Sequence, residues 1–174
     1  MTIDRPVRIL LVSGSLRAGS TNTALLTTAV AVAPEGVVTT FYDGLDSLPH
    51  FNPDDDVEGE PLPAAAADLR VQLDAADAVL FSTPEYAGAL PGSFKNFLDW
   101  TVGGGTYEKP VAWVNASSSP TGAASAHDRC APCCATRAPT SSSRPASTSR
   151  CHARRSGPTG SSQTRLCASE SAPS

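Results

Sequence analysis

The chain has 174 residues, which is enough for one domain with a sizeable core. Its formal net charge of −4 is unevenly divided, because residues 1–127 carry 6 basic and 15 acidic side chains while residues 128–174 carry 7 and 2. No apolar run approaches the ~20 residues of a membrane span, no secretory leader is visible and all 5 cysteines follow residue 129, so we expect a soluble, cytoplasmic protein without membrane contact.

The first predicted unit is a strand, a short loop and a helix. Ile9–Val12 is an unbroken apolar run, as is typical of a strand buried on both faces of a parallel sheet. A loop of small residues follows, and apolar residues then repeat at helical spacing from Thr23 to Ala33. Ser20 or Asn22 is the expected N-cap of this helix.

This loop has the composition of an anion site. A helix start offers unpaired backbone N–H groups, to which Ser13, Ser15 and Arg17 add hydroxyls and a cation, so a phosphate monoester would fit there. The loop contains neither the G-x-G-x-x-G fingerprint nor the Walker sequence, which argues against an ordinary nucleotide site. The alternative is a plain turn whose serines only cap the helix.

The later segments continue to alternate between strand and helix. Helices are expected to begin at Pro63 and Pro91, because proline favours the first helical position. The further predicted strands are Val37–Tyr42, Ala78–Ser82 and Val111–Ala116. The predicted fold class is therefore α/β, a doubly wound parallel sheet covered on both faces.

A long acidic connection from Asp43 to Pro63 separates the second strand from its helix. A loop of this length in a compact domain is usually functional or contacts a partner. We interpret His50 as a surface or packing histidine and Asp54-Asp55-Asp56 as a solvated acidic turn rather than a metal site.

Three loops of unusual composition follow the first, third and fourth predicted strands. They contain Ser13–Asn22, Thr83–Leu90 and Ser117–Gly122. In a doubly wound sheet of order 2-1-3-4-5, ligands bind in the crevice at the carboxyl ends of the first and third strands, with the fourth strand beside it. The three loops are therefore expected to converge on one site.

These residues resemble the NADPH-dependent FMN reductase family. The resemblance covers about residues 7–127 and is carried by an ordered set of motifs: Gly14-Ser15-Leu16-Arg17 with Ser20 and Asn22, Leu48-Pro49 with Asn52-Pro53, Pro84-Glu85-Tyr86 with Pro91-Gly92, and Lys95-Asn96 with Asp99-Trp100. It implies a flavodoxin-like fold, FMN and NADPH as cofactors, and quinones, free flavins, azo compounds or metal oxyanions as acceptors. It also implies a homodimer or homotetramer if the C-terminus is intact.

Carried over by position, the resemblance implies the residues of a cofactor site. The FMN phosphate would lie against Ser15, Arg17, Ser20 and Asn22, with Ser13 in the same loop, and the flavin ring would lie along Pro84, Glu85, Tyr86 and Gly88, with Ser117 and Ser118 from the third loop. Ala87 and Ala89 stand where Asn and Ser are frequent in the family, so flavin contacts there would come from the backbone.

The implied chemistry is hydride transfer from NADPH through FMN to a small acceptor. It needs no acid–base pair, and the sequence offers neither a catalytic triad nor a metal constellation. One alternative is a non-enzymatic FMN carrier that passes electrons to a basic protein partner through the acidic loop. Another is a protein that binds a different phosphorylated ligand at the loop of Arg17.

Residues 128–174 form a separate low-complexity segment rich in Ser, Arg, Ala and Pro. If one base is added after the codon of Asp128, residues 129–136 permit an amphipathic helix such as Ser-Leu-Arg-Thr-Val-Leu-Arg-Tyr, and residues 140–142 permit the start of a last strand. We therefore interpret 1–127 as an incomplete flavodoxin-like domain and 128–174 as a frameshifted or disordered tail. A Cys/His metal module around Cys130 and Cys133 or a nucleic-acid-binding tail is a weaker reading, because the cysteine spacing is irregular and no aromatic residue interleaves the arginines.

Overall fold

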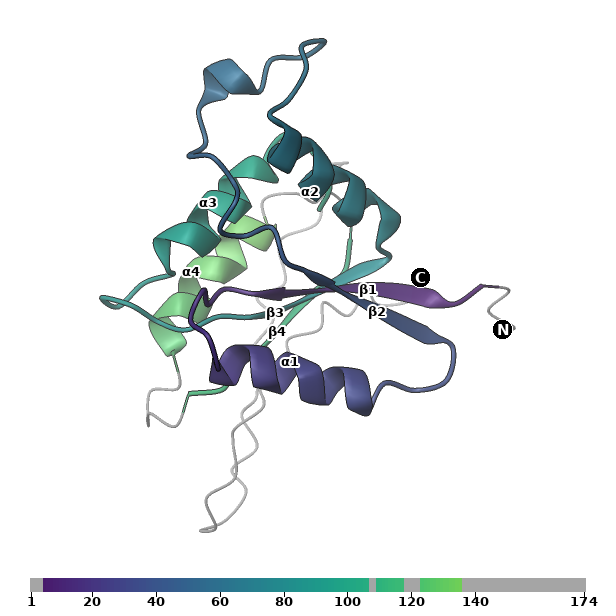
Figure 1. The fold of residues 1–174 in the computed structure, drawn as a ribbon. Coiled ribbons are helices and arrows are strands. Elements are labelled where there is room, and N and C mark those ends of the chain that lie inside the picture. The colour runs from purple at the N-terminus through teal and green to yellow at the C-terminus, as the bar shows by residue number, and fades with distance from the viewer. Residues whose placement is uncertain (1–4, 107–108, 118–122, 136–174) are drawn as a thin grey trace, which may run out of the picture.

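The protein is an α/β sandwich in which a parallel sheet lies between helices (Figure 1). The structure is a computed structural model, and it describes residues 5–106, 109–117 and 123–135. Its strands are β1 (Val7–Ser13), β2 (Val37–Tyr42), β3 (Ala78–Ser82) and β4 (Val111–Val114). Its helices are α1 (Thr21–Ala31), the 3-10 turn η1 (Pro53–Asp55), α2 (Ala64–Ala75), α3 (Gly92–Trp100) and α4 (Ala124–Ala135). The predicted fold class is confirmed.

Within the described residues the sheet has 4 parallel strands in the order β2-β1-β3-β4. This is the expected 2-1-3-4-5 order up to its fourth strand. Because β1 pairs with both β2 and β3, its carboxyl end lies at the point where the chain reverses its direction of winding. The loop after β1 is thus placed where such sheets bind ligands.

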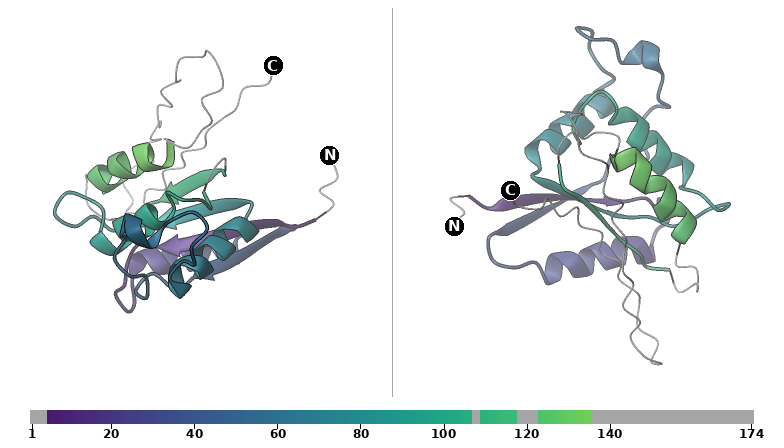
Figure 2. Two further views of the ribbon diagram at one scale, coloured as in Figure 1. Left: turned by 90° about the horizontal axis from the view of Figure 1, so that it is seen from above. Right: turned by 180° about the vertical axis from the view of Figure 1, so that it is seen from behind.

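The two faces of the sheet are covered by different helices. Leu11 of β1 packs with Leu26 of α1 on one face, whereas Leu10 and Val12 join the core formed with α2 and α3 on the other. This division follows from the alternation of side chains along a strand. Two further views show α1 on one face and, among the described helices, α4 beside α3 on the opposite one (Figure 2).

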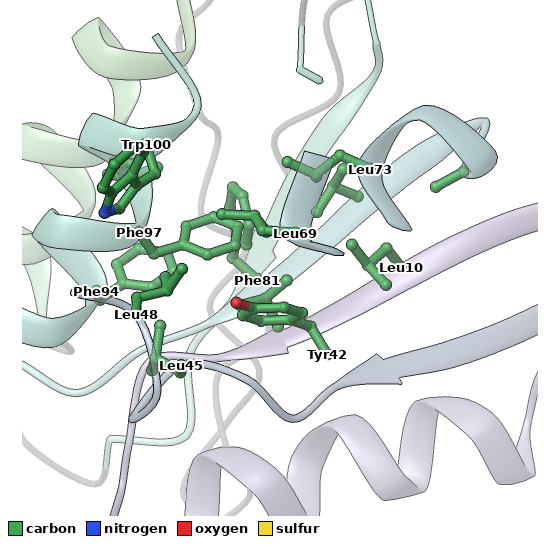
Figure 3. Close-up of a cluster of buried hydrophobic side chains, with 14 of the residues drawn as sticks. Leu10, Tyr42, Leu45, Leu48, Leu69, Leu73, Phe81, Phe94, Phe97 and Trp100 are labelled. Carbon is green, nitrogen blue, oxygen red and sulfur yellow. The ribbon is translucent and has the colours of Figure 1, made fainter. Parts of the chain in front are cut away.

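An aromatic cluster fills the core under α3 (Figure 3). Phe81 of β3 meets Phe94 and Phe97 edge-on, with ring centroids 5.2 and 5.9 Å apart, and the two α3 rings stack at 5.7 Å. The side chain of Tyr42, at the end of β2, packs against Phe97, and its buried hydroxyl has no hydrogen-bond partner within the described structure. Burial raises the pKa of Tyr42 well above its ordinary value.

Helix starts follow the sequence closely. Ser20 is the N-cap of α1 and its Oγ accepts a hydrogen bond from the N–H of Asn22 at 3.2 Å, which decides between the two expected caps. Pro63 and Pro91 occupy the N-cap positions of α2 and α3, one residue before each helix. The helix predicted over Thr23–Ala33 begins and ends two residues earlier, since Val32 is its C-cap.

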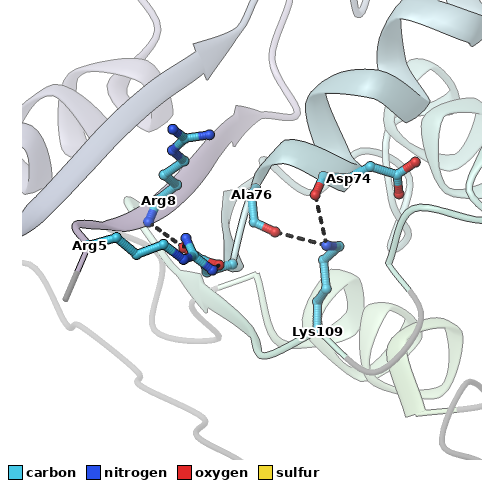
Figure 4. A network of polar contacts seen from close by, with 6 residues as sticks. Arg5, Arg8, Asp74, Ala76 and Lys109 are labelled. Atoms are coloured by element: carbon cyan, nitrogen blue, oxygen red, sulfur yellow. Dashed lines mark hydrogen bonds and ion pairs between the residues drawn. The ribbon is translucent and has the colours of Figure 1, made fainter. Parts of the chain in front are cut away.

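An exposed polar network ties the amino end of the sheet together (Figure 4). Asp77 accepts hydrogen bonds from the guanidinium of Arg5 at 2.6 and 2.9 Å and from the backbone N–H of Arg8 at 2.8 Å. The bond from Arg5, followed by that from Arg8, lowers the pKa of Asp77 to about 2. Nearby, Lys109 Nζ donates to the carbonyl of Ala76 at 2.8 Å, which places a cation at the C-terminal end of α2.

The long connection between β2 and α2 is fastened to α3. The side chain of Asn96 donates from Nδ2 to the carbonyl of Pro49 at 2.9 Å and accepts from the N–H of Phe51 at 2.8 Å. The indole N–H of Trp100 donates to the same Pro49 carbonyl at 2.8 Å. We call these three bonds the α3 clamp.

The acidic run within this connection is only partly solvated. Asp54 and Asp55 are exposed, but Asp56 forms an ion pair with Arg70 of α2 at 2.6 Å, and both side chains are less than a fifth exposed. Arg70 also donates to the carbonyl of Trp100 at 3.2 Å. The interpretation of all three residues as a solvated turn was therefore wrong for Asp56, because its partner arrives from another element. His50 is exposed, as expected.

Helix α4 runs across the boundary predicted between residues 127 and 128. The side chain of Cys130, beyond that boundary, is buried with the core that α2 and α3 share. The rest of the tail, including the expected last strand, lies outside the described residues, so the division of the chain stays a prediction. Within the described ranges, none of the helices combines the length and hydropathy that a membrane crossing requires.

Candidate functional site

The loops after β1 and β3 are joined to each other at the carboxyl end of the sheet, at the left in Figure 1. The N–H of Gly14 donates to the carbonyl of Ser82 at 2.8 Å, and Ser82 Oγ donates to Asn22 Oδ1 at 3.0 Å. The loop after β3 is joined in turn to α4, because Glu85 Oε2 accepts from the N–H of Ala126 at 3.2 Å. Direct hydrogen bonds thus join the first two of the three predicted loops, and the second of them is bound to the helix that follows the third.

Gly14 permits the close approach of the first two loops. A Cβ atom at this position would lie 2.2 Å from Thr83 Oγ1 and 2.6 Å from Thr83 Cβ, closer than any side chain could be accommodated without movement. Thr83 itself is buried. Glycine is therefore required here by the packing of the two loops rather than by its backbone angles.

The loop from Ser15 to Ser20 turns polar groups outward. The N–H of Arg17 donates to Ser15 Oγ at 3.4 Å, and the exposed guanidinium of Arg17 reaches the carbonyl of Gly19 at 3.3 Å. Arg17 has no ion-pair partner among the residues that the structure describes. The first turn of α1 contains no acidic residue, so the positive end of this helix is not neutralised from within the helix.

Two predicted cofactor residues are engaged inside the protein. Ser13 Oγ and Thr23 Oγ1 lie 2.9 Å apart and share a hydrogen bond, and the buried side chain of Asn22 pairs with Ser82. These contacts hold the start of α1 on the sheet. Ser13 and Asn22 therefore hold the loop on the sheet side, while Ser15 and Arg17 form its outer surface.

The loop after β3 closes in a tight two-residue turn. Tyr86 and Ala89 exchange two backbone hydrogen bonds, each 3.0 Å long. The central residues Ala87 and Gly88 have φ angles of 51° and 68°, as in a type I′ turn. Asn is common at the position of Ala87 in such turns because it tolerates positive φ, whereas alanine is strained there. Tyr86, at one end of this turn, is an exposed aromatic residue, with a relative accessibility of 56%.

The loop after β4 begins with an Asx turn. Asn115 is buried, and its Oδ1 accepts from the N–H of Ser117 at 2.8 Å. Ser117 thus follows directly from a fixed turn at the carboxyl end of β4. Ser118, the other residue predicted from this loop, lies outside the described residues.

Sequence reasoning missed Ser82, Thr23 and Asn115, the residues that hold these loops in place. Ser82 ends a strand that reads as apolar, and its partner Asn22 is 60 positions away. Asn115 offered a local signal, since an Asn two residues before a serine suits an Asx turn. No cluster of three or more metal-ligating side chains occurs within the described ranges.

The donor set of this edge fits the phosphate of FMN. The hydroxyl of Ser15, the guanidinium of Arg17 and the first-turn N–H groups of α1 are hydrogen-bond donors, and no carboxylate lies within the first turn. The neighbouring Tyr86–Ala89 turn brings an aromatic ring and exposed backbone to the same edge of the sheet. A phosphate and a flat ring would thus meet different loops.

Comparison with known proteins supports this arrangement. The profile of a family described as NADPH-dependent FMN reductase matches residues 7–147. The chain is 40% identical over 94 residues to an NAD(P)H-dependent FMN reductase of Pseudomonas aeruginosa, covering 54% of this chain and 49% of that protein. It is 38% identical over 101 residues to a protein of Oryza sativa subsp. japonica named Probable NADPH:quinone oxidoreductase 2, covering 57% and 49%. The chain therefore spans about half the length of the curated relatives it matches.

A solved structure agrees over a longer range. The flavoenzyme NAD(P)H:(acceptor) oxidoreductase FerB from Paracoccus denitrificans superposes with a TM-score of 0.67 and 28% sequence identity. The superposition covers 80% of this chain and 77% of the FerB chain. The similarity thus extends over most of both folds.

Proposed function

Because the chain belongs to the NADPH-dependent FMN reductase family, we propose that it is an NAD(P)H oxidoreductase that binds FMN across the loops after β1, β3 and β4. The observation that carries the proposal is the hydrogen bonding that joins the loops after β1 and β3 to each other and the loop after β3 to α4. Beside these bonds lies Arg17, which has no ion-pair partner within the described part of the chain. Among the candidate acceptors, quinones have the most support, since the rice relative is named a quinone oxidoreductase.

Each loop has a separate task in this proposal. Ser15, Arg17 and Ser20 bind the phosphate through hydroxyls, a cation and the start of α1. Ser13 and Asn22 hold that loop on the sheet. The turn of Tyr86 and Gly88, which follows Pro84 and Glu85, lies along the ring, and Ser117 with Ser118 contributes from the third loop.

The chemistry that bound FMN supplies is acceptance of a hydride from NAD(P)H and delivery of two electrons to an acceptor. The protein orients the ring, and no side chain is required to exchange a proton in the hydride step. Tyr86, at the exposed rim, is positioned to line the place of the second substrate. A homodimer or homotetramer and a cytoplasmic location stay predictions.

The first test is a titration of the chain with FMN and with riboflavin, which lacks the phosphate, followed by flavin fluorescence. Arg17→Ala should weaken FMN binding about 10- to 100-fold, the loss of a charge-assisted hydrogen bond, and leave riboflavin binding unchanged. Arg8→Ala is the matched control, since Arg8 is an exposed arginine at the opposite end of β1. Equal FMN affinity in the wild type and Arg17→Ala would remove the phosphate site from this loop.

The same titration is repeated with the protein encoded by a gene that has one base added after the codon of Asp128. Binding by both chains supports a site that is complete before the tail, and binding by the altered chain alone supports a frameshift. Absence of FMN binding in both chains would end the flavin proposal. Steady NADPH oxidation with a soluble quinone then distinguishes an enzyme from an electron carrier, because a carrier needs its protein partner to turn over.

A further inference from the structure

Glu85 is the residue that connects the β3 loop with the start of α4. Its half-buried carboxylate accepts from the N–H of Ala126, the third residue of α4, at 3.2 Å. That N–H belongs to the first turn, where no intrahelical partner exists. An acid at this position stabilises a helix both by the hydrogen bond and by its charge.

Backbone strain occurs on both sides of this connection. Among the described residues, Ala87 and Ala123 are the non-glycine residues with positive φ, at 51° and 55°. Ala87 follows Glu85 by two positions, and Ala123 precedes α4 directly. Such conformations persist only where the surrounding contacts hold them, and they are common at ligand sites.

The starts of α1 and α4 differ in charge. The cap of α1 is the neutral hydroxyl of Ser20, and its first turn has no acid. The start of α4 receives the carboxylate of Glu85. Glu85 is therefore engaged with the backbone of α4, and the β3 loop is left to contact a ligand through its turn.

We propose that Glu85 is a positioning residue of the cofactor site, which through Ala126 holds the strained Tyr86–Ala89 turn in the place where its backbone meets the flavin ring. This inference rests on the proposed function. It assigns the role of Glu85 to the length of its side chain, because it is the terminal Oε2 atom that accepts from the Ala126 N–H. The negative charge of Glu85 has the smaller part in positioning the flavin ring.

Three variants separate reach from charge. Glu85→Gln keeps the length and the acceptor oxygen but removes the charge, Glu85→Asp keeps the charge but is one methylene shorter, and Glu85→Ala removes both. Glu58→Ala is the matched control, because Glu58 is exposed on the connection between β2 and α2. Leu73→Val, a buried change in α2, serves as a control for a general loss of stability.

Two properties are measured for each variant: the affinity for FMN by fluorescence titration, and amide hydrogen exchange over residues 84–90 and 124–130 without FMN. We expect Glu85→Gln to remain within about threefold of the wild type, and Glu85→Asp and Glu85→Ala to bind FMN about tenfold more weakly, the equivalent of one lost hydrogen bond. Exchange over both segments should rise in the latter two variants alone. The absorption band of bound FMN should shift in the same two variants and not in Leu73→Val.

Two results would overturn the inference. If the wild type binds FMN and all Glu85 variants bind it equally, the contact only caps a helix. If Glu85→Asp resembles the wild type while Glu85→Gln is weakened, the carboxylate acts through its charge. A wild type that binds no FMN contradicts the proposed function instead, and the exchange measurement still tests whether the Glu85 side chain holds the turn.

Discussion

Ala87 adopts a backbone conformation that costs an alanine about 1 kcal/mol or more. Asn tolerates this conformation, so Ala87→Asn should raise the free energy of unfolding by about 0.5–1 kcal/mol, visible as a higher urea midpoint. The matched control is Ala89→Asn in the same turn, where φ is not positive and no gain is expected. A lower midpoint for Ala87→Asn would mean that the turn does not hold this geometry in solution.

Single residues were predictable where their role is local. Ser20 was one of two expected caps because Ser and Asn both accept from the N–H two residues on, and sequence alone does not separate them. The structure separates them through Ser82, which arrives from β3 and occupies the side chain of Asn22. Glu85 is a similar case, since its partner Ala126 is 41 positions away.

Among the elements, α3 fastens the long connection between β2 and α2 through the three hydrogen bonds of the α3 clamp. Asn96→Ala removes two of its bonds and leaves the N–H of Phe51 unpaired, which should lower the free energy of unfolding by about 1–3 kcal/mol. Limited proteolysis should then cut the connection near Pro49 faster.

The control for the clamp is Lys95→Ala on the same helix. Lys95 forms an exposed ion pair with Asp99 one turn away, and such pairs contribute about 0.5 kcal/mol or less. The two variants remove neighbouring side chains of comparable size. Equal rates of cleavage in both would show that the connection is held by its apolar contacts, Leu45 and Leu48, rather than by Asn96.

Two of the described strands were predicted to the residue, whereas the predicted strand Ile9–Val12 was three residues shorter than β1. Val37–Tyr42 and Ala78–Ser82 agree with the structure in full, because short apolar or β-branched runs bounded by turn residues have few other conformations. Val111–Ala116 was too long by two residues, since Asn115 turns the chain. The ion pair of Asp56 with Arg70 and the three bonds of the α3 clamp were beyond prediction, because they join elements whose relative position the pattern does not contain.

For the molecule as a whole, Asp77 makes stability depend on acidity. Its folded pKa of about 2 lies below the ordinary 3.8, so its contribution is complete above about pH 4 and is lost as the pH falls toward 2. Asp77→Asn should therefore reduce the loss of stability between pH 4 and 2, measured by urea unfolding at each pH. The matched control is Asp74→Asn, an exposed change three residues earlier, and equal slopes in the two variants would contradict the role of Asp77.

Gly14 has a consequence for any attempt to diversify this protein by directed evolution. Because a methyl group at position 14 would overlap the side chain of Thr83, the residues at positions 14 and 83 depend on each other. A recombined gene must therefore inherit both positions from the same parent. Randomisation is better placed at Leu16 and Tyr86, which are each 56% exposed and do not fill the contact between Gly14 and Thr83. New acceptor preferences should therefore be sought at these two positions, with the glycine beneath them left untouched.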